Sequence, residues 1–187
     1  MWTRYGSILH AVTSTGCVAN GGGSLGKQFG AAWGRRKRLQ CAALPLEPGS
    51  DFPKVLLVTT RRSGHWVIPK GWAEPDLLPH LLAGREAFEE AGVFGEVEPV
   101  PIGEYTYRKR MSDGHRVPCR VTVFSMTVLG FAEVWPERGQ RRSLWVSLDE
   151  AAVLVKEPGL AGFLRQIASS PTAHPRQRGS QSGVPLG

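Results

Sequence analysis

Residues 71–93 read GWAEPDLLPHLLAGREAFEEAGV, and this stretch decides the fold that the sequence predicts. The apolar residues from Asp76 to Ala91 recur with helical spacing. Asp76 is the expected N-cap, Pro79 suits the first turn, and Gly92 follows as a C-terminal stop. The stretch therefore predicts a helix with a defined beginning and end.

Three carboxylates lie on one face of this helix, because Glu86, Glu89 and Glu90 stand at positions i, i+3 and i+4. Like charges at this spacing repel one another, whereas a hard divalent cation prefers several oxygen ligands in a compact cluster. A Mg²⁺ site explains the crowding. The alternative is a solvated acidic face on which Arg85 pairs with Glu89, and the triplet alone does not separate the two interpretations.

The residues before the helix add context. His65 to Ile68 is expected to form a short strand that Pro69 stops, and a turn at Gly71 brings a backbone carbonyl towards the carboxylates. Read as a whole, Trp66 to Val93 resembles the Nudix box, a loop-helix-loop signature of phosphoanhydride hydrolases. The matching positions are Gly71, Arg85, Glu86, Glu89, Glu90, Gly92 and Val93.

Two positions depart from that signature. Leu77 stands where the family carries a glutamate, and Ala87 stands where it prefers a bulky aliphatic residue. Leu77 removes a charge near the metal, so a reduced rate or an altered number of metal ions is expected. The Arg-Glu-x-x-Glu-Glu core is unaffected.

The resemblance extends from about Gln40 to about Ala168. The bacterial Nudix branch similar to diphosphoinositol polyphosphate phosphohydrolases is the one that this chain resembles at residues 40–45, 66–72, 105–110 and 135–140. The resemblance implies an α/β fold, an α/β/α sandwich around a mixed β-sheet. It also implies hydrolysis of a phosphoanhydride bond in a polyphosphorylated small molecule, such as a dinucleoside polyphosphate or a diphosphoinositol polyphosphate. Glu86, Glu89 and Glu90 become the expected catalytic residues. Together with the Gly71 carbonyl they are also the expected ligands of Mg²⁺, or of Mn²⁺ in its place.

Further side chains are candidates for the site. Arg85 is expected to orient Glu89 or the preceding loop, and Glu133 or Glu137 is a candidate for a further carboxylate from another loop. The expected substrate-binding cations are Arg61, Arg62, Lys70, Arg108 and Arg110. Their guanidinium groups can grip phosphates with two hydrogen bonds. Strand alternation places Lys109 on the face opposite to Arg108 and Arg110.

The remaining elements are predicted from residue patterns. Strands are expected over 39–46, 55–60, 98–110, 116–129 and 143–146, with a hairpin at Asp113-Gly114. Helices are expected over 148–155 and 160–168. The domain prediction is a basic flexible extension over 1–35, a catalytic domain over 36–169 and a disordered tail over 170–187.

The net charge of +7 resides in the ends of the chain. Residues 1–46 hold six basic residues and no acid, and 170–187 hold two and no acid, so the middle has 15 basic and 16 acidic residues. Nucleic acid is therefore not an expected partner, and no membrane association is expected. Three widely spaced cysteines favour a reducing, cytoplasmic setting. An organellar transit peptide is the alternative for the acid-free start, although the glycines at 21–23 suit no amphipathic helix.

A second function class stays open at this stage, a catalytically weak or silent Nudix-fold module that binds RNA or another polyanion. Leu77 and the basic ends favour it, and the intact glutamates favour the enzyme. Within the enzyme class, hydrolysis of nucleoside triphosphates or of ADP-ribose is open too. The oligomeric state is not predicted.

Deleting residues 1–35 and 170–187 is expected to leave the melting temperature and the catalytic rate nearly unchanged, because neither end has the apolar pattern needed to pack on a core. Thermal unfolding and steady-state kinetics of the trimmed chain measure this. A large loss of either property would contradict the domain boundaries.

Overall fold

The computed structural model describes residues 38–49 and 53–170. The predicted extension over 1–35 and nearly all of the predicted tail lie outside these ranges. The first strands are β1 (Leu39–Leu46), β2 (Lys54–Thr59), β3 (Trp66–Val67) and β4 (Lys70–Trp72). Helix α2 (Pro79–Ala91) follows, and then β5 (Val93–Arg110), β6 (Arg116–Phe131), β7 (Ser143–Ser147), α3 (Leu148–Leu154) and α4 (Pro158–Ala168).

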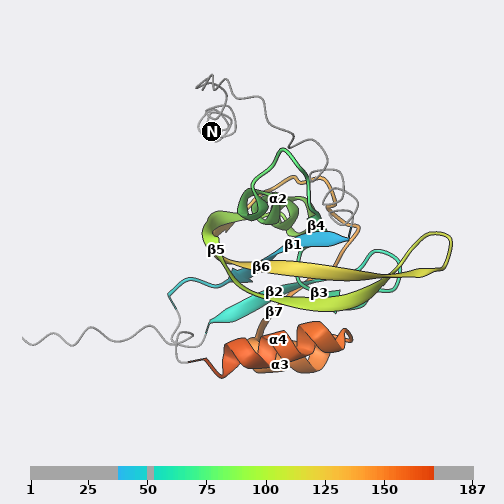
Figure 1. The fold of residues 1–187 in the computed structure, drawn as a ribbon. Coiled ribbons are helices and arrows are strands. Elements are labelled where there is room, and N and C mark those ends of the chain that lie inside the picture. The colour runs from blue at the N-terminus through green and yellow to red at the C-terminus, as the bar shows by residue number, and fades with distance from the viewer. Residues whose placement is uncertain (1–37, 50–52, 171–187) are drawn as a thin grey trace, which may run out of the picture. The chain divides into compact units, whose positions relative to one another are not determined.

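The seven strands form one mixed sheet in the order β3-β2-β1-β6-β5, with β4 paired to β1 and β7 paired to β2. Strands β1 and β6 run parallel over eight residue pairs, and the other pairings are antiparallel. Helix α2 covers one face of the sheet, and α3 and α4 cover the other (Figure 1). The predicted α/β/α sandwich around a mixed sheet is confirmed.

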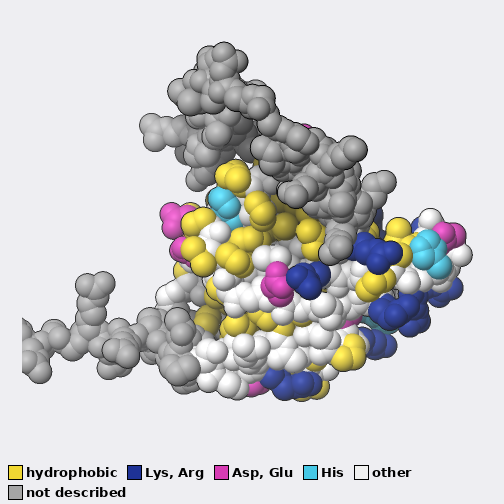
Figure 2. All heavy atoms as spheres, viewed as in Figure 1, with side chains coloured by type: hydrophobic (Ala, Val, Ile, Leu, Met, Phe, Trp, Pro, Cys, Tyr) yellow, Lys and Arg dark blue, Asp and Glu magenta, His cyan; other side chains and the backbone are white. Residues whose placement is uncertain are grey.

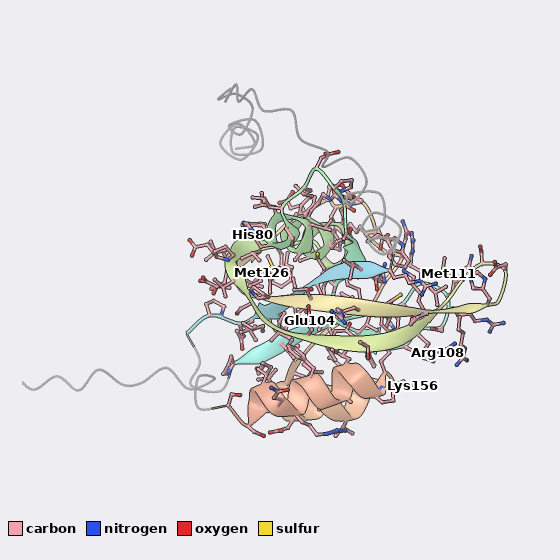
Figure 3. All side chains as sticks on the ribbon, viewed as in Figure 1. His80, Glu104, Arg108, Met111, Met126 and Lys156 are labelled. Atoms are coloured by element: carbon pink, nitrogen blue, oxygen red, sulfur yellow. The ribbon has the colours of Figure 1, made fainter. Side chains whose placement is uncertain are left out.

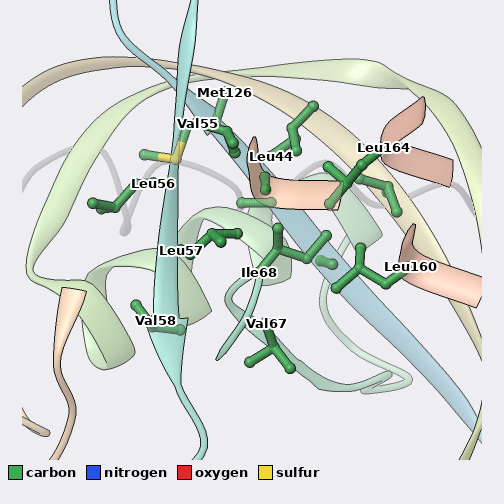
Figure 4. Close-up of a cluster of buried hydrophobic side chains, with 14 of the residues drawn as sticks. Leu44, Val55, Leu56, Leu57, Val58, Val67, Ile68, Met126, Leu160 and Leu164 are labelled. Atoms are coloured by element: carbon green, nitrogen blue, oxygen red, sulfur yellow. The ribbon is translucent and has the colours of Figure 1, made fainter. Parts of the chain in front are cut away.

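The core is aliphatic and follows from the apolar runs of β1 and β2. Leu44, Leu57 and Ile68 are fully buried and meet Leu160 and Leu164 of α4 (Figure 4). On the opposite face, α2 buries Leu82 together with three alanines, Ala83, Ala87 and Ala91. The small side chains leave room for the helix axis to lie close to the sheet. Ala87, one of the departures from the family signature, thus has a packing role.

The start of α2 differs from the prediction. Leu78 occupies the N-cap position and makes no side-chain cap hydrogen bond, so Asp76 as N-cap is wrong. Pro79 explains the difference, because its fixed φ and missing N–H favour the first helical position. The predicted end is confirmed: Gly92 adopts φ 71°, and its N–H donates to the Phe88 carbonyl.

Two strand predictions also need correction. Gly71, expected in a turn, lies in β4 opposite Cys41, and a strand of three residues is too short to show alternation. Strand β5 begins at Val93 and not at residue 98, because Val93 already pairs with Phe131. Register shifts around Pro101 and Gly103 interrupt the period of two along β5 and hid its first part. The hairpin at Asp113-Gly114 is present between β5 and β6.

Candidate functional site: a carboxylate face beside a basic cavity

Strand β4 and helix α2 bring two of the predicted metal-binding residues, Gly71 and Glu86, into contact. The Glu86 carboxylate lies directly over Gly71, so that a Cβ added to Gly71 would overlap it. Glycine is the residue that this approach permits. Sequence spacing predicted both positions, and the structure places them in contact.

Arg85 anchors the loop before α2, as expected. Its guanidinium donates two hydrogen bonds to the Glu74 carboxylate, one of them at 3.2 Å. Its Nε lies 3.6 Å from Glu89 Oε1. The hydrogen bonds from Arg85 lower the pKa of Glu74. Glu74 was not singled out from the sequence, although its position three residues after Gly71 placed it in the same loop.

Glu90 and Arg141 form a buried ion pair behind the carboxylate face. The two side chains are 8% and 9% exposed, and Arg141 Nη2 lies 2.5 Å from Glu90 Oε1. Arg141 also donates to the Glu137 carboxylate and, at 2.9 Å, to the Thr59 carbonyl. It thereby ties α2, the loop before β7 and the end of β2 together. Sequence reasoning missed Arg141, because two of its three partners, Thr59 and Glu90, lie 82 and 51 residues away.

Glu137, one of the two candidates for a further carboxylate, joins this cluster. Its N–H donates to the Glu89 carbonyl at 3.1 Å, and its Oε1 lies 3.0 Å from Arg61 Nη1. Glu133 is exposed and has no such contacts among the described residues. The loop is held against the box by Trp135, whose indole packs so closely on Gly92 that a Cβ there would overlap it.

Around Glu86 and Glu90, the neighbouring cations do not fully offset burial and the repulsion between carboxylates. Burial raises the pKa of Glu90 to about 7, opposed by Arg141 and Lys70 and assisted by Glu86 and Glu137. Burial also raises the pKa of Glu86, and the neighbouring Glu89 raises it further. Removal from water and mutual repulsion both disfavour the ionised forms. A bound cation would reverse both effects.

The donor set fits a hard divalent cation. Carboxylate and carbonyl oxygens are the preferred ligands of such ions, and Glu90 Oε2 is buried without a hydrogen-bond partner. As the side chains stand, no three acidic, histidine or cysteine residues in the described ranges are close enough to enclose an ion. Glu90 is turned to Arg141 and Glu89 to Arg85. Joint ligation therefore requires the glutamate side chains to rotate, which their flexible stems permit.

A cavity of about 1320 Å³ opens beside the carboxylates, and Glu90 lies in its wall. All five predicted substrate-binding residues, Arg61, Arg62, Lys70, Arg108 and Arg110, line it. So do four cations that were not assigned to the substrate, Lys109, Arg116, Arg141 and Lys156, against two acids, Glu90 and Glu157. Lys and Arg side chains gather over the ends of β5 and β6 in Figure 2. The cavity therefore suits a ligand with several negative charges.

Side chains alternate in exposure along 108–110 of β5. Arg108 and Arg110 are exposed, whereas Lys109 is half-buried, and its ammonium lies 4.3 Å from the centre of the Trp72 ring. Burial lowers the pKa of Lys109. The nearby Cys119, Glu90 and Glu86 raise it and so oppose the effect of burial. Lys70 faces Tyr107 on the same side, at 5.8 Å from the ring centre. Lys109 thus joins the candidate phosphate-binding residues.

None of the helices in 38–49 and 53–170 combines the length and the apolar content that spanning a bilayer requires.

Several known proteins are similar to this chain in sequence. A scan against protein-family models finds no match. Nudix hydrolase 18, mitochondrial, from Arabidopsis thaliana is 32% identical over 123 residues, 63% of this chain and 68% of that protein. Nudix hydrolase 12, mitochondrial, from the same plant is 34% identical over 129 residues, 64% of each chain. Diphosphoinositol polyphosphate phosphohydrolase 2 from Rattus norvegicus is 29% identical over 147 residues, 74% of this chain and 75% of that one.

The chain covers only part of the length of several relatives. It spans 64% of Nudix hydrolase 12, and 45% and 61% of Nudix hydrolases 4 and 13 from Arabidopsis thaliana. A Nudix hydrolase from Nitrosomonas europaea superposes with a TM-score of 0.53 at 25% identity, over 69% of this chain and 86% of that one. A C. elegans Ap4A hydrolase in a binary complex shares the fold, with a TM-score of 0.53 at 16% identity over 70% and 94%.

Proposed function

Because the chain belongs to the Nudix hydrolase family, we propose that it is a metal-dependent phosphohydrolase that cleaves a phosphoanhydride bond in a polyphosphorylated small molecule. One observation carries this proposal: Glu90, which belongs to a repelling set of glutamates and has an unpartnered buried oxygen, lines a cavity whose charged side chains are mostly cations. The glutamates suit a divalent ion, and the cations suit phosphates. The two requirements of the reaction are met side by side.

Glu86, Glu89, Glu90 and the Gly71 carbonyl are the proposed ligands of Mg²⁺ or Mn²⁺. When bound, such an ion lowers the pKa of a water molecule and neutralises charge on phosphoryl oxygens. Glu86, held over Gly71, is the proposed group that accepts a proton from the attacking water. Arg85 keeps Glu89 and the loop before α2 in place. Arg141 fixes Glu90 and Glu137, so it is a positioning residue.

The cations of the cavity are proposed to bind the phosphate chain. A ligand with four or more charged phosphates can contact several of them at once, each charged hydrogen bond contributing about 1.5–3 kcal/mol. The names of two similar proteins, a diphosphoinositol polyphosphate phosphohydrolase and an Ap4A hydrolase, support this substrate class. The cytoplasm is the proposed location, since Cys41 and Cys119 are both free and buried.

A cleavage assay tests the function. Cleavage products are separated by anion-exchange chromatography after incubation with nucleoside triphosphates, ADP-ribose, dinucleoside polyphosphates or inositol pyrophosphates, each with and without Mg²⁺. We expect cleavage only with the metal. Absence of cleavage of every substrate would contradict the enzyme and favour a silent polyanion-binding module.

The cavity also predicts a substrate ranking. Dinucleoside tetraphosphates are expected to have a higher kcat/KM than ADP-ribose, which has two phosphates and engages fewer cations. Lys109→Ala and Arg110→Ala are expected to reduce this preference mainly through KM. Steady-state kinetics at fixed Mg²⁺ and ionic strength measure it, because salt screens exposed charges.

The matched control is Arg120→Ala, which removes an exposed cation that does not line the cavity. It is expected to leave the ranking unchanged. A tenfold advantage for ADP-ribose in the parent protein would contradict the polyphosphate assignment and leave the hydrolase proposal intact.

A further inference from the structure

One acidic side chain stands out in the basic cavity. Glu157 lines it at the start of α4, and Glu157 and Glu90 are the cavity's two acids. In Figure 3 Lys156, the residue before it, lies on the same side as Arg108 of β5, and both line the cavity. A carboxylate weakens the binding of any phosphate nearby. A cavity that bound phosphates alone would therefore bind them more tightly without this carboxylate.

Glu157 is not explained by pairing with the cations around it. Its Oε2 is buried without a hydrogen-bond partner, and among the described residues it forms no ion pair. Lys70 and Lys109 are near enough to oppose the effect of burial on its carboxyl pKa, which burial raises. Neither ammonium forms an ion pair with a carboxylate in 38–49 or 53–170. Among the described residues, these three charged groups thus line one cavity without forming ion pairs.

The backbone fixes Glu157 in this place. Two residues later, Gly159 packs so closely on the Thr106 carbonyl of β5 that a Cβ there would overlap it. Pro158 occupies the first turn of α4 and restricts Glu157 to an extended conformation, observed at φ −80° and ψ 112°. The carboxylate is therefore held at the cavity by the contact between α4 and β5.

From this arrangement we infer that Glu157 accepts a hydrogen bond from a free hydroxyl of the substrate, next to phosphates held by Lys70 and Lys109. The inference rests on the proposed function for its ligand class, and it narrows that class. A ribose carries free hydroxyls beside its phosphate chain. A fully phosphorylated inositol ring has none and would place a phosphate against the carboxylate. The structure thus favours a nucleoside polyphosphate over a fully phosphorylated inositol.

Equilibrium binding tests this inference apart from catalysis. Calorimetry is performed at fixed ionic strength with Ca²⁺ in place of Mg²⁺, under conditions where chromatography detects no cleavage of the probes. The probes are di(adenosine) tetraphosphate, its analogue lacking the 2′ and 3′ hydroxyls of both riboses, and inositol hexakisphosphate. The proteins are the parent, Glu157→Ala, Glu157→Gln and the matched control Glu98→Gln. Glu98 is exposed on β5 and does not line the cavity.

The parent is expected to bind the hydroxylated dinucleotide about tenfold more tightly than its deoxygenated analogue, because a site built for a hydroxyl leaves a polar group unpaired without it. Glu157→Ala should abolish that ratio. Glu157→Gln, whose amide oxygen still accepts, should retain about a third of it. Both should bind inositol hexakisphosphate more tightly than the parent, and Glu98→Gln should match the parent throughout.

Two outcomes would overturn the inference. A parent protein that binds the two dinucleotides equally has no hydroxyl contact. If Glu157→Ala changes the affinity for both dinucleotides by the same factor, the carboxylate acts only through its charge. By contrast, a hydroxyl preference that depends on Glu157 in a protein that cleaves none of the substrates in Mg²⁺ would support the inference and contradict the proposed hydrolase.

Discussion

Replacing Glu89 with glutamine is expected to lower kcat by about 100-fold or more while the fold survives. The amide keeps the shape of the side chain and removes the negative charge that both metal binding and charge stabilisation need. The Glu89 side chain is 40% exposed, and Arg85, at 3.6 Å, is its ion-pair partner among the described residues. Little stability therefore depends on it. Steady-state kinetics over a range of Mg²⁺ concentrations and a thermal melt measure the two effects.

Glu133→Gln is the matched control for this experiment, since it removes one exposed carboxylate outside the cluster. It is expected to behave as the parent does. Glu86→Gln should resemble Glu89→Gln in its rate. Turnover close to the parent in both Glu86→Gln and Glu89→Gln, with unchanged melting, would rule out the proposed ligand set.

Replacing Arg141 with methionine is expected to destabilise the fold by about 3–5 kcal/mol, which lowers the melting temperature by about 10 °C or more. The substitution keeps most of the apolar stem but leaves Glu90 buried without its cation. It also removes the donors to Glu137 and to the Thr59 carbonyl. Removing one member of a buried ion pair costs much more than the pair itself contributes. Differential scanning calorimetry of the metal-free protein measures the change.

Arg138→Met provides the comparison for Arg141→Met. Arg138 lies three residues earlier in the same loop, is exposed, and has its guanidinium 5.5 Å from the Trp135 ring centre. Exposed contacts of this kind contribute about 0.5–1 kcal/mol, so a shift of only a few degrees is expected. An Arg141→Met protein that melts within about 2 °C of the parent would show that the buried pair is not a structural anchor.

Much of the fold was predictable because its signals are local. Apolar periodicity gave the helices, Asp113-Gly114 gave the hairpin, and Gly92 marked the end of α2. Predictions failed where local patterns are short or interrupted. Strand β4 has three residues, and the first part of β5 is hidden by register shifts. Leu78 in place of Asp76 at the N-cap shows that the geometry of Pro79 outweighed a good capping residue.

The sequence by itself determined which residues are the candidates for the chemistry. The glutamates at i, i+3 and i+4, the glycine before them and the five cations were all identified by type and spacing, because helix and strand periods decide which side chains share a face. The tertiary structure decided how those groups are neutralised and what surrounds them. Arg141 reaches Glu90 across 51 residues, and Glu157 meets the cavity only because α4 packs on β5 at Gly159 and Thr106. Such partners depend on the path of the whole chain through the sheet, and no local pattern records that path.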